Sequence, residues 1–140
     1  MRKAKSTIAI ATLGLAAFTV GASAQSSRTF VSGSGSDANA CSRTAPCQTF
    51  GGAIAKTNAG GEINCLDAGS YGAVTITKAI TIDCSYTEGG ITAAGTVGVA
   101  INVAAPAVVT LAGLDIQGTG TNNGVNVVQV GTLHLRNMRS

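Results

Sequence analysis

The chain has 140 residues, of which 11% are charged and 4% aromatic, with 19 glycines and no Trp. Its formal net charge of +3 comes from Arg2, Lys3 and Lys5, so residues 25–140 carry as many acidic as basic side chains. A neutral surface gives no electrostatic reason to expect nucleic acid or an anionic membrane as a partner.

The first 24 residues have the pattern of an export signal. A basic start is followed by an apolar segment over residues 8–20 and by the small-residue site Ala22-Ser23-Ala24. We predict a signal peptide over residues 1–24, cleaved before Gln25, and a secreted or periplasmic mature protein. An uncleaved anchor is the alternative, but the apolar segment is short for a membrane span, and no later segment approaches about 18 apolar residues.

A strand, a loop and a helix are expected next. The strand covers residues 28–32, and a polar loop rich in Gly and Ser covers 33–47. A helix is predicted over 48–58, because Phe50, Ala53 and Ile54 share one helical face. The pair Gly60-Gly61 would end it.

Within the loop, Asp37-Ala38-Asn39 weakly resembles part of a calcium-binding loop. The other acidic positions of such a loop are missing, so a turn stabilised by Asx hydrogen bonds is the better interpretation.

From about Gly72 onward the sequence consists of short β-branched strands that recur roughly every two dozen residues. One set of strands covers residues 74–76, 101–103 and 125–127, and a second covers 80–82, 109–111 and 133–135. The spacing matches Ile76 with Val103 and Val127, and Ile82 with Leu111 and Leu135. Such a period predicts a solenoid, in which each coil buries its apolar side only against the next coil.

The four cysteines, Cys41, Cys47, Cys65 and Cys84, allow three disulfide pairings in an exported chain. Cys41 and Cys47 flank a short loop, while Cys65 and Cys84 end similar strands about one coil apart. The spacing favours Cys41–Cys47 and Cys65–Cys84, with two buried thiols as the alternative for the second pair. No zinc site is expected, because the Cys-x₂-Cys spacing is missing and the sole histidine, His134, is distant.

The order of these parts resembles the start of exported bacterial right-handed parallel β-helix proteins of the broad pectate-lyase-like superfamily. The resemblance covers about residues 28–137. The segments that carry it are Thr29-Phe30-Val31-Ser32-Gly33, Asp37-Ala38-Asn39, Pro46-Cys47-Gln48-Thr49-Phe50, Ala53-Ile54, Gly60-Gly61-Glu62-Ile63, Ala68-Gly69-Ser70-Tyr71 and Val109-Thr110-Leu111-Ala112-Gly113-Leu114-Asp115-Ile116.

The resemblance implies an all-β fold, a right-handed parallel β-helix of about three to four coils with a short N-terminal capping helix. The domain would span residues 25–140, with the cap region at 28–60 and the coils at 61–140. Capping agrees with the physics, because an open solenoid end exposes apolar side chains and strand edges.

No matching cap is visible towards Ser140, so we expect the domain to be incomplete at its C-terminus. Self-association through the open C-terminal end is the alternative.

The resemblance also implies what a polysaccharide lyase would need: carboxylates clustered for Ca²⁺ and an Arg or Lys base. Asp67, Asp83 and Asp115 are the strand-associated carboxylates, with Lys78 and Arg136 as bases. In one register Asp83 and Asp115 stack on adjacent coils. In the favoured register Leu111 stacks on Ile82, Asp83 lies beside Ala112, and the carboxylates separate.

We therefore assign no catalytic residue, no metal site and no cofactor. Asp83, Asp115, His134 and Arg136 are kept as candidates for a surface site.

Sugar-binding surfaces often use exposed aromatic side chains, and Tyr71 and Tyr86 are the candidates here. Tyr71 is better placed at a coil corner, and Phe30 and Phe50 are expected in the core or the cap. The composition favours a structural, adhesive or glycan-binding role without a catalytic site, with a cell-surface or extracellular glycan as partner. The alternative is a truncated relative of a polysaccharide lyase that acts on acidic glycans and needs Ca²⁺.

Overall fold

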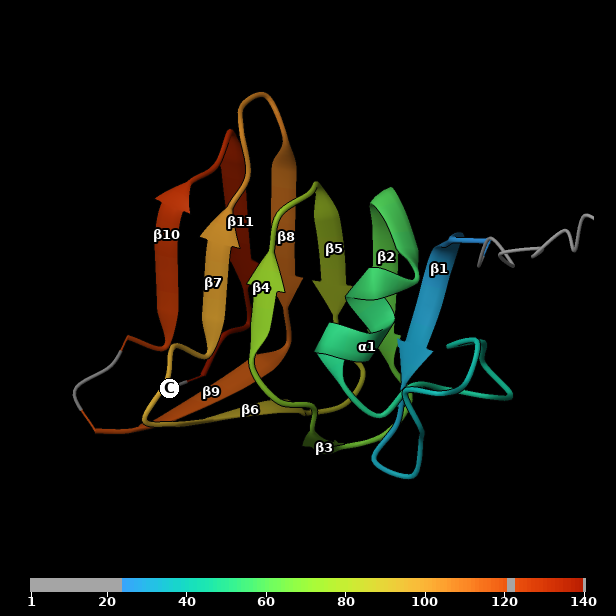
Figure 1. Cartoon of the computed structure of the whole chain (residues 1–140). Coiled ribbons are helices and arrows are strands. Elements are labelled where there is room, and N and C mark those ends of the chain that lie inside the picture. Colours follow the sequence, from blue (N-terminus) through green and yellow to red (C-terminus); the bar gives the residue numbers. More distant parts are fainter. Residues whose placement is uncertain (1–23, 121–122, 140) are drawn as a thin grey trace, which may run out of the picture.

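The computed structural model describes residues 24–120 and 123–139 and consists mainly of strands (Figure 1). All of the predicted signal peptide except Ala24 lies outside the described residues. No helix in the described part is long and apolar enough to cross a membrane. The elements are β1 (Ser26–Val31), α1 (Phe50–Ala55), β2 (Thr57–Cys65), β3 (Gly69–Ser70), β4 (Val74–Ile76), β5 (Ile80–Asp83), β6 (Gly89–Ala94), β7 (Val99–Asn102), β8 (Val108–Ala112), β9 (Leu114–Thr119), β10 (Val125–Gln129) and β11 (Thr132–Arg136).

The strands form three sheets in which all paired neighbours are parallel. The largest has the order β1-β2-β5-β8-β11, and the other two have the orders β4-β7-β10 and β3-β6-β9. From β2 onward the chain visits the three sheets in a fixed cycle, and each visit adds a strand beside the previous one (Figure 1). This cycle accounts for the sequence period and confirms the all-β class.

One apolar core lies between the three sheets and receives alternate side chains from each strand. In the five-stranded sheet Ile63, Ile82 and Leu111 are paired in successive strands, and all three are fully buried. The other two sheets contribute the pairs Ile76 with Ile101 and Ile91 with Ile116. Each such side chain stabilises the fold by about 2 kcal/mol relative to exposure.

The predicted register is confirmed in the five-stranded sheet, where Leu111 pairs with Ile82 and with Leu135. It was wrong in the sheet of β4, β7 and β10, where Ile76 pairs with Ile101 rather than with Val103. Val97, Val99, Ile101 and Val103 are all apolar at alternate positions, so spacing alone did not identify the first residue of β7.

The helix is shorter than the predicted 48–58 and ends where Thr57 enters β2. The buried Thr57 hydroxyl donates to the carbonyl of Ala53 at 2.7 Å and lies 2.8 Å from the Thr29 hydroxyl. Gly60 therefore does not end the helix but lies within β2, with φ +77°. A contact between distant segments sets this boundary.

The N-terminal end of the stack is covered on two sides. Helix α1 continues the row of β10, β7 and β4 and contacts β1, β2 and β4 (Figure 1). Phe50 and Ala53 are fully buried, and the Phe50 ring centroid lies 5.2 Å from that of Tyr71. The outer edge of β1 is also occupied, because Phe30 N donates to Cys41 O and Cys47 N donates to Phe30 O. These contacts support the capping role.

Both favoured disulfides are present, Cys41–Cys47 and Cys65–Cys84. The second joins β2 to the residue after β5, across a Cα–Cα distance of 4.9 Å. Gly89 packs against it, since a Cβ there would lie 2.5 Å from Cys84 Sγ. Two disulfides fit an oxidising compartment.

At the other end of the described stack, β9, β10 and β11 are the outer strands. Val128 is 69% exposed and Leu135 51%. Arg139 pairs with part of the β9 edge. Exposed apolar side chains favour association, so self-association at this end stays a prediction.

Replacing Phe50 by Asp should lower the free energy of unfolding by more than about 3 kcal/mol, because it removes a buried ring and buries a charge. Ala55→Asp places the same charge on the exposed side of the same helix. It should cost under about 1 kcal/mol. Urea unfolding followed by circular dichroism measures both. Equal effects of the two variants would show that α1 does not act as a cap.

Candidate functional site

The loop between β5 and β6 separates two surface hollows that share Thr87. Tyr86 lies in this loop and is 98% exposed, the largest exposure among the large apolar side chains of the described residues. We call the first the β1–β2 hollow; it has a volume of about 320 Å³ and is lined by Arg28, Phe30, Arg43, Asn64, Cys65, Leu66, Tyr86 and Thr87. We call the second the β9 hollow; it has a volume of about 220 Å³ and is lined by Ser85, Thr87, Glu88, Gly113, Leu114, Asp115, Asn137 and Arg139.

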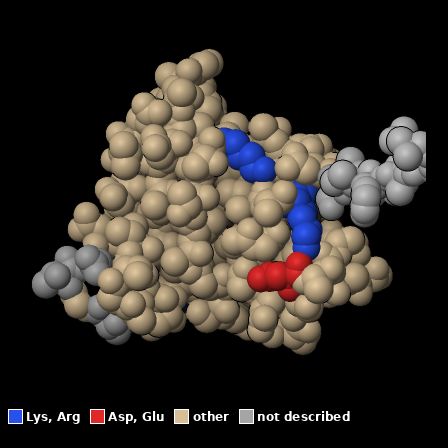
Figure 2. Space-filling model, viewed as in Figure 1, with Lys and Arg blue, Asp and Glu red and all other residues tan. Residues whose placement is uncertain are grey.

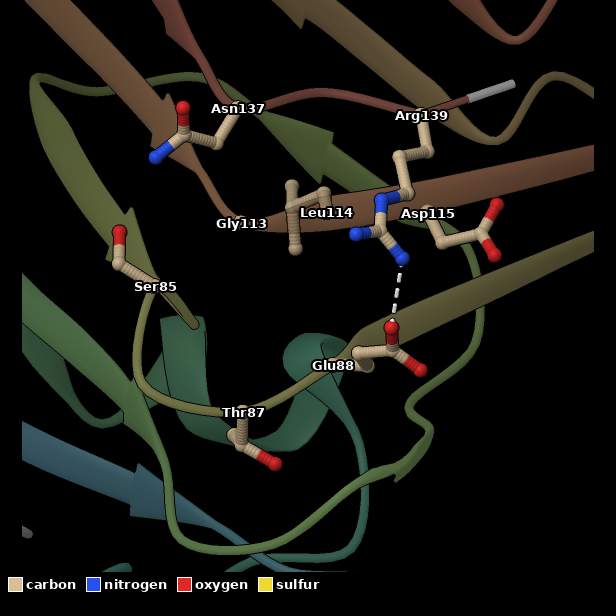
Figure 3. Close-up of a pocket in the computed structure, with 8 residues that line it drawn as sticks. All are labelled: Ser85, Thr87, Glu88, Gly113, Leu114, Asp115, Asn137 and Arg139. Carbon is tan, nitrogen blue, oxygen red and sulfur yellow. Dashed lines mark hydrogen bonds and ion pairs between the residues drawn. The ribbon is translucent and has the colours of Figure 1, made fainter.

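The β9 hollow is lined by both acidic and basic side chains (Figure 3). Arg139 Nη1 lies 2.7 Å from Glu88 Oε1, and both side chains are well exposed, so the ion pair adds little stability. Figure 3 shows the Arg139 guanidinium reaching towards Glu88, while Asp115 points away from Ser85. Hydroxyls, carboxylates and a guanidinium together can donate to and accept from the hydroxyl groups of a neutral ligand.

The β1–β2 hollow brings together side chains from four separate segments of the chain. Phe30 points outward, because its neighbours Thr29 and Val31 are buried, so its expected place in the core or cap was wrong. Arg43, from the loop closed by Cys41–Cys47, lies over the Phe30 ring at 5.7 Å from its centroid. A cation over an aromatic face is attracted by the ring quadrupole, which holds Arg43 at the edge of this hollow.

Asp67 has a structural role. Its carboxylate accepts hydrogen bonds from Gly33 N at 2.8 Å, from the Ser32 hydroxyl and from the Tyr71 hydroxyl at 2.7 Å. The bond from Gly33, with that from Ser32, holds the pKa of the Asp67 carboxyl below its usual value against the opposing effect of burial. Burial and the Asp67 carboxylate raise the pKa of Tyr71 above its ordinary range. This cluster fastens the 33–47 loop to the first turn of the stack.

Asp37 also has a structural role, but not in the predicted Asx turn. Its carboxylate accepts from the backbone N–H groups of Gln48 and Thr49, both at 2.9 Å, at the start of α1. Burial acts to raise the pKa of Asp37, but the hydrogen bonds from Thr49 and Gln48 and the charge of Lys56 outweigh it and lower the pKa.

The four candidate surface residues do not form one site. Asp83 pairs with Ala112 in the five-stranded sheet, as in the favoured register, whereas Asp115 lies in β9 of another sheet. His134 and Arg136 are exposed on β11. Asp115 is the one member of the four that lines either hollow.

Sequence reasoning missed Arg28, Arg43 and Asn64 in one hollow, and Glu88 and Arg139 in the other. Two sequence features could have indicated these hollows. Arg43 lies inside the loop closed by the Cys41–Cys47 disulfide, and Tyr86 lies in a polar loop between two strands. In residues 24–120 and 123–139, no group of three or more His, Cys, Asp or Glu side chains is placed to hold a metal ion.

Comparisons found no matching protein-family model, no matching curated protein and no matching solved structure.

Asp67→Ala should destabilise the protein by about 2 kcal/mol at pH 7, because the buried side chains of Tyr71 and Ser32 lose their acceptor. The folded-state pKa of Asp67 is lowered. Its ionic contribution is therefore complete above the unfolded value of about 3.9 and is lost as pH falls through the folded value.

The difference in unfolding free energy between wild type and Asp67→Ala should therefore be constant from about pH 7 to 5 and shrink below about pH 4. Asp115→Ala, at a surface carboxylate, should change stability by less than about 0.5 kcal/mol. A difference for Asp67→Ala that stays unchanged on acidification would rule out this role for the charge.

Proposed function

We propose that this protein is a secreted or periplasmic right-handed parallel β-helix that binds glycans around Tyr86. The parallel pairing in three sheets, the fixed cycle between them and the covered N-terminal end support this fold. Crossover connections between parallel strands of one sheet are right-handed in about 98% of cases, which supports the handedness. The export-signal pattern and the two disulfides support the location.

Glycan binding rests on Tyr86, which is 98% exposed in the loop between two polar hollows. Exposing an aromatic side chain to water is unfavourable, and the ring offers a flat apolar face with a polar hydroxyl at its edge. The C–H-rich face of a sugar ring can pack on such a surface. The hollows on each side then supply donors and acceptors for sugar hydroxyls.

A structural or adhesive contribution is supported by a different surface. Figure 2 shows that the face over β4, β7 and β10 carries almost no charged side chains, and that the charges visible there gather near α1. Thr75, Ala100 and Asn126 form one outward row across these strands. Such a face can make neutral hydrogen-bonded contacts without long-range steering by charge.

Tyr86→Ala should weaken the binding of any oligosaccharide selected from a glycan array by about tenfold, because a stacking contact contributes up to about 1.5 kcal/mol. Tyr86→Phe keeps the ring and should retain most of the affinity. Isothermal titration with the selected oligosaccharide measures both variants. Unchanged binding by Tyr86→Ala, with an unchanged melting temperature, would exclude Tyr86 as the platform.

The alternative of a truncated polysaccharide lyase has weaker support. Asp83 and Asp115 lie in separate sheets, and the Asp67 carboxylate already accepts three hydrogen bonds. We expect the purified mature protein to release no unsaturated product from polygalacturonate, with or without Ca²⁺. Such a product, formed with Ca²⁺ and abolished by Asp83→Ala, would favour the lyase.

A further inference from the structure

The last coil of the described stack leaves two strand edges and part of the core uncovered. No strand in the part of the chain that the structure describes pairs with the outer edge of β10 or of β11. Beside these edges the core opens into a hollow of about 270 Å³, lined by Ile116, Gly124, Val125, Leu135, Met138 and Arg139. Val127 is 41% exposed and Val128 69%. This end therefore suits a partner that brings free strand edges and apolar side chains of its own.

The N-terminal end of a second copy is not such a partner, because it is closed. Helix α1 covers the core there, and Cys41 and Cys47 hydrogen-bond to Phe30 at the outer edge of β1. The C-terminal end of a second copy does present free edges. A contact between two identical surfaces is closed by a two-fold axis, so it gives a dimer and not a filament. Net charge does not oppose it, because residues 25–140 carry as many acidic as basic side chains.

The backbone of β11 fits a copy of itself in an antiparallel register. Thr132 N donates to Ala107 O at the start of the pairing with β8, so by alternation the backbone groups of His134 also face β8. The N–H and C=O groups of Leu133 and Leu135 then face the free edge. In an antiparallel pair centred on His134, Leu133 of each copy lies opposite Leu135 of the other, and the two residues can exchange both hydrogen bonds.

We infer that two copies of this protein associate end to end, with their β11 strands paired antiparallel and His134 on the two-fold axis. The inward side chains of Leu133 and Leu135 from both copies would then continue the core row of Leu111 and Ile82. The partner is a second copy of this chain, and the inference does not depend on glycan binding.

The same axis keeps like charges apart and covers β10. Arg136 lies opposite the neutral Thr132 of the second copy, so the two arginines are at opposite ends of the paired strands. Val127 and His134 are equally far along the chain from the turn between β10 and β11. The axis therefore passes close to Val127, and the exposed valines of the two β10 strands meet.

Cysteine cross-linking of the purified mature protein tests the register. Residues opposite each other at a non-hydrogen-bonded antiparallel position have Cα atoms about 4.5 Å apart, within the range for a disulfide. His134→Cys should form a covalent dimer, linked from one introduced cysteine to the other in peptide mapping. Thr132→Cys mixed with Arg136→Cys should link between the two variants more than within either. Thr75→Cys, an exposed site on β4, is the control and should stay largely unlinked.

Sedimentation equilibrium tests the dimer itself. The mature protein should show a monomer–dimer equilibrium in the micromolar range. Leu135→Lys places a charge on the inward side of the edge and should weaken the dimer by at least about tenfold, whereas Thr75→Lys should not change it. A monomer throughout the micromolar range, or assembly beyond the dimer, would overturn the inference. So would a dimer that Leu135→Lys leaves intact, or one in which Thr75→Cys links as readily as His134→Cys.

Discussion

The in-register stacking of parallel strands in the five-stranded sheet is the constraint on which the rest of the structure depends. Ile63, Ile82 and Leu111 lie on one another inside the core, and a slip of one residue would turn this row towards solvent. The same register fixes where each strand ends and therefore where its loop leaves the sheet. The loop that carries Tyr86 begins at Cys84, which is bonded to Cys65 of the neighbouring strand.

The N-terminal region combines a structural role with the proposed binding role. The loop closed by Cys41–Cys47 hydrogen-bonds to the outer edge of β1 and blocks further strand pairing there. The same loop places Arg43 over Phe30 at the wall of the β1–β2 hollow. Asp67 holds the start of the loop through Ser32 and Gly33. Changes that loosen this loop should therefore also disturb the proposed binding surface.

The sequence predicted the structure correctly where a residue pattern recurs at the coil spacing or marks the end of a strand. The register of Ile82 with Leu111 and both disulfides could be predicted, because strand ends and cysteines recur at the coil spacing. The extent of α1 could not, because its end depends on the pairing of Thr57 with a strand far back in the chain.

The candidate site was harder to predict, since each hollow joins side chains from separate segments. Arg28, Arg43 and Tyr86 have no common spacing in the sequence, and the fold alone brings them together. The role of Asp67 was hidden for the same reason, because two of its donors lie more than thirty residues earlier. Phe30 was misplaced because its hydrophobicity suggested burial, whereas the strand alternation points it outward.

The most direct test of the account is the register of β5 against β8, measured by cross-linking. Thr81 and Thr110 are paired outward neighbours. Parallel neighbours lie about 4.8 Å apart, within the range for a disulfide. The double variant Thr81→Cys/Thr110→Cys should form a disulfide between its two introduced cysteines in non-reducing peptide mapping, while Asp83→Cys/Asp115→Cys should not link. A link in the second variant and none in the first would contradict this register. The strands would then stack differently, and the residues around Tyr86 would not lie together as described.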